Sequence, residues 1–167
     1  MKKNKITGGC YCGEVRFSAS PEVRVSTNCH CANCRRAAGA QAVAWIIVKR
    51  SQFQFVKGTP RRYQTETGAW RTFCGSCGTS LTYETDKRPD EIDITTGSLD
   101  HPEDFPPTKD VYPEERLPWV DLIPPLSLHS FINVYDVRPR KDHHGFDLIS
   151  DVLPSSTRAI SKSRRAF

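Results

Sequence analysis

Cys29-His30-Cys31-Ala32-Asn33-Cys34 places three thiols within six residues, the largest group of cysteines in the chain. Two shorter stretches, Cys10-Tyr11-Cys12 and Cys74-Gly75-Ser76-Cys77-Gly78, contain the other four of the seven cysteines. Thiols at such short spacings are typical of metal sites, and an odd number of cysteines fits a set of disulfides poorly. The sequence therefore indicates a metalloprotein whose fold depends on how the three stretches combine.

Zinc accounts for all seven cysteines. Structural zinc sites have four protein ligands, whereas catalytic sites have three and leave one position to water or substrate. The Cys-x-x-Cys-Gly turn supplies two ligands, and the first stretch supplies two more, because residues 10 and 12 of an extended chain share a face. An iron–sulfur cluster fits less well, since it takes four cysteines and would leave three unused. We predict two zinc ions, one enclosed by Cys10, Cys12, Cys74 and Cys77, and one held by Cys29, Cys31 and Cys34 with an open position.

Charge and hydropathy limit the cellular setting and the partners. Residues 1–121 contain 17 Lys and Arg against 15 Asp and Glu, and residues 122–167 contain 7 against 4. The nearly balanced body argues against a nucleic-acid footprint there, and the basic tail leaves weak phosphate contacts open. The N-terminus lacks the apolar segment of a signal peptide, and no apolar run is long enough to span a membrane. We therefore expect a cytoplasmic protein, and its oligomeric state is not predicted.

The body reads as a series of short strands. Alternating or β-branched apolar patterns predict strands at residues 14–18, 42–48, 53–56, 61–65, 69–73, 80–83 and 91–95. The continuous apolar run at 42–48 predicts a central strand buried on both faces, and Lys57-Gly58-Thr59-Pro60 predicts a hairpin between its flanking strands. Helix signals are confined to a single turn at 35–38, ended by Gly39. The expected fold is mainly β, built from short antiparallel sheets that zinc ties together.

The amino-acid composition of the chain changes after Asp121. Pro124-Pro125 interrupts regular structure, residues 130–135 suggest an edge strand, and the segment from Arg138 onward has the polar, basic composition of a solvated tail. We place the domain boundary here, with a two-zinc domain at 1–121 and a basic, partly disordered extension at 122–167.

The cysteine stretches and their neighbours resemble one known family. Gly8-Gly9-Cys10-x-Cys12-Gly13, Cys29-His30-Cys31-x-x-Cys34-Arg35, Arg71-x-Phe73-Cys74-x-x-Cys77-Gly78 and Thr96-Gly97-Ser98-Leu99-Asp100 occur in this order, followed by Pro118-Trp119. The sequence from about Gly8 to Asp121 thus resembles the glutathione-dependent formaldehyde-activating family, whose domain also occurs in centromere protein V. The resemblance implies an Mss4-like β fold and the same two-zinc partition. It also implies a carbon–sulfur lyase that interconverts glutathione and formaldehyde with S-hydroxymethylglutathione.

Such chemistry would take place at Cys29, Cys31 and Cys34, because a thiol entering the open position is deprotonated by the metal. Arg35 and Arg36 follow the three cysteines and either form a solvated turn or hold a glutathione carboxylate by bidentate pairing, with Arg35 favoured because the family pattern has an arginine there. Three thiolates nevertheless make zinc a weak Lewis acid, and thiols combine with formaldehyde unaided. The residues alone therefore leave open a non-catalytic, protein-binding module whose second zinc is closed by a ligand such as His101. We expect a packing or solvent-facing role for His30, rather than a ligand or acid–base role, and packing roles for Trp45 and Trp70.

Overall fold

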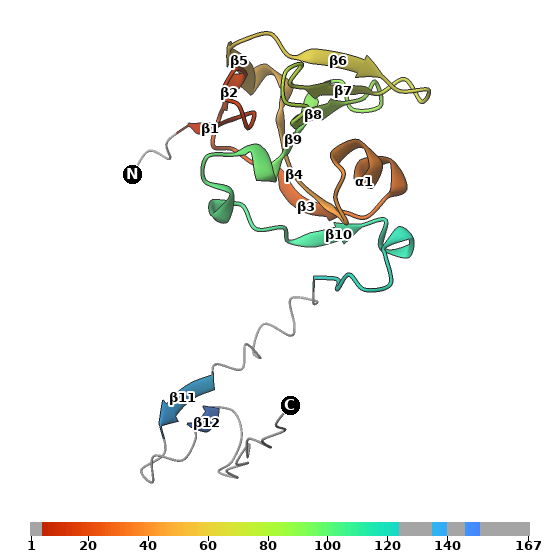
Figure 1. Cartoon of the computed structure of the whole chain (residues 1–167). Helices are drawn as coiled ribbons and strands as arrows, with labels where there is room; N and C mark the ends of the chain where they lie inside the picture. Colours follow the sequence, from red (N-terminus) through yellow and green to blue (C-terminus); the bar gives the residue numbers. More distant parts are fainter. Residues whose placement is uncertain (1–4, 124–134, 140–145, 151–167) are drawn as a thin grey trace, which may run out of the picture. The chain divides into compact units, whose positions relative to one another are not determined.

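The computed structural model describes residues 5–123, 135–139 and 146–150 (Figure 1). The chain divides into two compact units, Met1–Ile123 and Pro124–Phe167. Strands and short 3-10 helices make up most of the regular secondary structure of the first unit, and the described residues contain one α-helix, so the expected mainly β fold is confirmed. None of the described helices is long and apolar enough to cross a membrane. The boundary at Asp121 stays a prediction.

The smaller sheet of the first unit has three antiparallel strands in the order β1, β2, β5. Their bounds are Ile6–Gly9, Arg16–Ala19 and Phe53–Lys57. Phe17 and Phe53 face each other with ring centroids 5.5 Å apart and are both buried. This aromatic contact brings the N-terminal strands against the middle of the chain.

The larger sheet has seven strands, and only its β10–β3 edge pair is parallel. The strands lie in the order β10 (Lys109–Val111), β3 (Val25–Cys29), β4 (Val43–Lys49), β9 (Glu91–Thr95), β8 (Ser80–Glu84), β7 (Trp70–Phe73) and β6 (Arg61–Gln64). Strand β4 is an interior strand, as predicted. Ile46 and Val48 join the main apolar core, whereas Val43 and Trp45 pack with Cys29 and Cys34 in a second cluster.

The predicted hairpin across residues 57–60 is wrong. Strand β5 pairs with β2 in the small sheet, and β6 pairs with β7 in the large one. The turn itself forms, with Gly58 at a φ of 69°, but it leads the chain from one sheet to the other. The reason is burial: Phe53 packs in the core against Phe17, whereas every residue of β6 is exposed.

The helix is longer than the single turn expected at 35–38. Helix α1 spans Ala32–Ala38 and ends, as predicted, at Gly39 in the left-handed conformation. Its N-cap is Cys31, whose sulfur accepts the Cys34 backbone N–H at 3.3 Å. Cysteine is not among the usual N-cap residues, so this helix start could not be located from residue type.

Short 3-10 helices connect the strands: η1 (Arg50–Gln52), η2 (Thr96–Ser98), η3 (Pro102–Asp104) and η4 (Pro113–Glu115). The loop after η2 is tied to the N-terminal strands, because the Asp100 carboxylate accepts hydrogen bonds from two guanidinium nitrogens of Arg16 and from the Thr7 hydroxyl. Gly8 lies so close to Phe17 and the Ser98 carbonyl that a side chain there would overlap both. These contacts explain why Gly8 and Asp100 belong to the motifs noted above.

The second unit contains two described strands, β11 (Tyr135–Pro139) and β12 (Phe146–Ser150), which pair in antiparallel fashion. The segment after Arg138 is therefore not a solvated tail throughout. Of the edge strand expected at 130–135, all but Tyr135 lies outside the described residues.

Candidate metal centres and the adjoining cavity

Two similar turns bring the first four cysteines together. Cys10 and Cys12 lie in the turn between β1 and β2, and Cys74 and Cys77 lie in the turn between β7 and β8. The glycine after each pair has a φ near +75° (74° at Gly13 and 75° at Gly78), and its N–H donates to the carbonyl of the first cysteine of the pair at 3.0 Å. The extended geometry expected for Cys10 and Cys12 is thus wrong. The chain folds there into a tight turn that is one residue shorter than the turn at residues 74–78, and each turn ends at a glycine that adopts a positive φ.

The sulfurs of this four-cysteine cluster fit a tetrahedral metal. The Sγ atoms of Cys10 and Cys12 are 3.5 Å apart, those of Cys12 and Cys74 are 3.8 Å apart, and all four lie within 4.8 Å of one another. Zinc–sulfur bonds of 2.3 Å in a tetrahedron require sulfurs about 3.8 Å apart. The distances are far too long for disulfides, and all seven cysteines are free. The predicted grouping of these four residues therefore corresponds to the geometry.

The other three cysteines form a second cluster at the junction of a strand and the helix. Cys29 ends β3, Cys31 caps α1, and Cys34 lies in its first turn. Their Sγ atoms lie within 4.8 Å of one another, with Cys29 and Cys34 buried and Cys31 partly exposed. Among the described residues, no histidine, aspartate or glutamate adds a ligand atom to this group. The three-cysteine cluster thus offers a donor set that suits zinc and is one ligand short of four.

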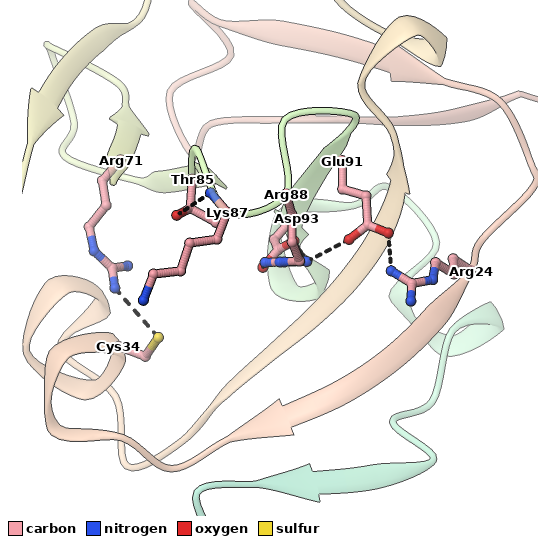
Figure 2. A network of polar contacts seen from close by, with 8 residues as sticks. All are labelled: Arg24, Cys34, Arg71, Thr85, Lys87, Arg88, Glu91 and Asp93. Carbon is pink, nitrogen blue, oxygen red and sulfur yellow. Dashed lines mark hydrogen bonds and ion pairs between the residues drawn. The ribbon is translucent and has the colours of Figure 1, made fainter. Parts of the chain in front are cut away.

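Arg71, which belongs to the family pattern, lies next to the three-cysteine cluster. It comes from β7, is 9% exposed, and its guanidinium donates to the Cys34 sulfur at 3.5 Å (Figure 2). The pKa of Cys34 is lowered to about 5, mainly by the hydrogen bond that it shares with Cys29 and further by the neighbouring Arg71 guanidinium. The hydrogen bond with Cys34, together with burial, raises the pKa of Cys29. The Arg71 cation therefore favours negative charge on the sulfur that it contacts. The sign of this contact in the sequence was an arginine within a predicted strand.

A cavity of about 860 Å³ opens beside the three-cysteine cluster. Its wall includes Cys31, Cys34, Arg36, Arg71, Tyr63 and Tyr83. Neither arginine forms an ion pair with any described residue. The cavity therefore combines thiols, two arginines that have no carboxylate partner among the described residues, and aromatic rings, which suits a ligand with both a sulfur and an anionic group.

A smaller cavity of about 350 Å³ reaches Cys29 and Cys34 from strands β3, β4 and β9. Its charged residues are largely paired with one another. Arg88 donates to both carboxylate oxygens of Asp93 at 3.0 and 2.8 Å and to Glu91 at 2.9 Å, and Glu91 also pairs with Arg24 (Figure 2). These arginines are therefore less available to an anionic ligand than Arg36, which lines the larger cavity.

Arg35 and His30 face away from the large cavity. The Arg35 side chain donates to the His30 carbonyl at 3.0 Å and to the Glu115 carbonyl at 3.5 Å, and it is not part of the cavity wall. Its predicted carboxylate contact stays a prediction. His30 is fully buried and its Nε2 lies 2.6 Å from Asp110 Oδ1, so its expected packing role is confirmed. Trp45 is likewise buried in the core, and Trp70 lies under the Arg62 guanidinium at 4.5 Å.

His101 does not close the three-cysteine cluster. It is exposed, and its Nδ1 lies 3.2 Å from Glu103 Oε1. The suggested closure of the second site by this histidine is therefore wrong.

The sequence matches the family described as "Glutathione-dependent formaldehyde-activating enzyme" over residues 5–115, more than half of the chain and including all seven cysteines. Among solved structures, a Rhodobacter sphaeroides protein is similar in fold, with a TM-score of 0.53 and 24% sequence identity. That comparison covers 63% of this chain and 99% of the other. The chain belongs to the glutathione-dependent formaldehyde-activating enzyme family.

Proposed function

We propose that the protein is a zinc-dependent carbon–sulfur lyase that acts on a small thiol–aldehyde adduct such as S-hydroxymethylglutathione. The observation that carries the proposal is the three-cysteine cluster, which lies on a cavity wall beside Arg71 and has no fourth protein ligand among the described residues. Cys29, Cys31 and Cys34 would hold one zinc ion, and Cys10, Cys12, Cys74 and Cys77 would hold a structural one. At the first site, zinc would supply a position where an incoming thiol loses its proton near neutral pH.

The residues around the cluster then favour a bound thiolate. Three cysteine thiolates exceed the charge of Zn²⁺ by one, and a fourth thiolate would make the excess two. Arg71, 3.5 Å from the Cys34 sulfur and nearly buried, offsets part of this charge where screening by water is weak. Arg36, in the wall of the same cavity, is placed to pair with a carboxylate of the thiol compound.

The reaction itself is an addition and its reverse. In synthesis, the thiolate sulfur donates an electron pair to the carbonyl carbon of the aldehyde, the carbon–oxygen π pair moves to oxygen, and the oxygen takes up a proton. In lysis, the hydroxyl proton leaves, the carbonyl re-forms and the carbon–sulfur bond breaks toward sulfur. The protein contributes by holding the thiolate in a confined cavity next to the aldehyde.

Cobalt substitution tests the proposal, because the visible spectrum of tetrahedral cobalt reports how many sulfurs surround it. The protein is loaded with two cobalt ions under a phosphine reductant, and glutathione is then added. We expect a saturable spectral change from the three-cysteine site and none from the four-cysteine site. The matched control, Cys31→Ala, should retain cobalt at the four-cysteine site and show no change with glutathione.

The arginines give a second comparison in the same titration. Arg36→Ala should weaken glutathione binding by about 1 kcal/mol, or roughly fivefold, as expected for a partly exposed charge pair. Arg35→Ala should have a smaller effect, because its guanidinium already donates to two carbonyls. A cobalt spectrum that ignores every thiol would refute the lyase and leave a two-zinc binding module.

A further inference from the structure

Tyr112 has a strained backbone next to the three-cysteine cluster. Its φ of 55° and ψ of 49° lie in the left-handed region, and it is the only described residue other than glycine with a positive φ. The next residue is Pro113, and a residue before proline favours extended backbone, which Tyr112 does not adopt. Such strain costs on the order of 1–3 kcal/mol and clusters at functional sites.

The position of Tyr112 is fixed by its neighbours. Val111, the last residue of β10, is in register with Cys29, and its carbonyl accepts the His30 N–H at 3.1 Å. On the other side, Glu115 accepts the Ala32 N–H at 2.8 Å and so ties η4 to the start of α1. Tyr112 therefore lies between two segments that each contact the three-cysteine loop.

A structural requirement for this turn does not explain a tyrosine. Glycine or asparagine would adopt the left-handed conformation at lower cost. The Tyr112 side chain is also 54% exposed, so packing in the core does not offset the strain. It lines both the 860 Å³ and the 350 Å³ cavities, a property that it shares with Cys34 and Tyr83 alone.

We propose that Tyr112 is a specificity-determining residue whose ring contacts the organic substituent of a thiol bound at the three-cysteine cluster. This inference rests on the proposed function. A substituted thiol such as glutathione would lie in the larger cavity and reach the ring, whereas mercaptoethanol is too short to gain much from it. The strained conformation is thus retained because it places an aromatic ring at the junction of the two cavities.

Tyr112→Gly and Tyr112→Ala test the proposal together, because both remove the ring and they differ in their tolerance of the left-handed conformation. Thermal unfolding, at fixed zinc, should give a midpoint about 3–6 °C higher for the glycine variant than for the alanine variant. In the cobalt titration, both variants should bind glutathione about three- to tenfold more weakly than the unmodified protein, with less than a twofold change for mercaptoethanol.

Tyr63 provides the control pair. It lines only the larger cavity and lies in the regular strand β6, where glycine is less stable than alanine, so Tyr63→Gly should melt below Tyr63→Ala. The proposal is overturned if Tyr112→Ala is as stable as Tyr112→Gly, or if both variants bind glutathione as the unmodified protein does. An unmodified protein that shows no response to glutathione would overturn the proposed function and, with it, this inference.

Discussion

Removing the Asp110 carboxylate should destabilise the protein strongly, because three donors converge on it. His30 Nε2 and the Ile123 N–H each lie 2.6 Å from its oxygens, and Asn28 Nδ2 lies 3.3 Å away. The Asp110 side chain is 8% exposed and that of His30 is 0% exposed. Since His30 lies between two of the clustered cysteines, this carboxylate also holds their loop against β10.

The magnitude follows from the partners that each substitution leaves unpaired. Asp110→Ala removes all three contacts, and it leaves His30 Nε2 with only the 3.5 Å contact to Asn28 Nδ2, while Nδ1 is already buried and has no partner among the described residues. At roughly 1–3 kcal/mol per buried polar group left unsatisfied, the free energy of unfolding should fall by about 3–5 kcal/mol. Asp110→Asn keeps the oxygen that faces His30 but turns a donor toward the Ile123 N–H, so it should cost about 1–2 kcal/mol.

Urea unfolding followed by tryptophan fluorescence, at fixed zinc and under a phosphine reductant, measures these differences. The matched control is Glu103→Ala, which removes the acidic partner of the exposed His101. Because solvent screens that pair, the control should change stability by less than about 0.5 kcal/mol. The reasoning fails if Asp110→Ala costs less than about 1 kcal/mol, or if the control costs as much as Asp110→Ala does.

Three further perturbations test the two cysteine clusters, the extent of the first unit and the close packing at Gly8. Cys74→Ala should leave the protein unfolded or insoluble, because Cys74 is fully buried and structural zinc contributes roughly 10–16 kcal/mol in small domains. Cys31→Ala should instead leave a folded chain in which elemental analysis finds one zinc. Equal collapse of both variants would make both sites structural. Ending the chain after Ile123 should preserve zinc content and the unfolding midpoint, because the first unit ends there, and a fall in either would place later residues in its fold. Gly8→Ala should cost about 1–3 kcal/mol in urea unfolding, because its methyl would overlap a core ring and a carbonyl, and Gly97→Ala, which has open space, should cost clearly less.

The parts of the fold that were predictable from sequence are those with a strong local pattern. Strand β4 has an unbroken apolar run, and β9 alternates, so both were located correctly. The grouping of the cysteines followed from their spacing and from the number of ligands that zinc takes. For the strands, a few neighbouring residues contain the whole signal, whereas the four-cysteine cluster also required the number of ligands that zinc takes.

Apart from the four-cysteine cluster, the features that depend on contacts between distant residues could not be predicted. Strand β3 is polar in sequence and gains its partners from β4 and from β10, which pairs with it from about 80 residues downstream. Arg71 contacts Cys34 across 37 residues, and no local pattern places them together. Arg35 and Arg36 are adjacent in sequence, yet helix geometry sends one toward backbone carbonyls and the other to the cavity.

The two cysteine clusters differ in how much chain must be ordered before each can form. The three-cysteine cluster spans six residues, whereas the four-cysteine cluster brings together Cys12 and Cys74, which are 62 positions apart in the sequence. Loop-closure entropy makes the longer closure costlier by about 2 kcal/mol in an unfolded chain. We therefore expect a nascent chain to capture its first zinc at Cys29, Cys31 and Cys34, and the second ion to enter late in folding. Metal loading would then follow the order of contact formation, and zinc limitation during synthesis would leave chains with a filled local site and an unclosed core.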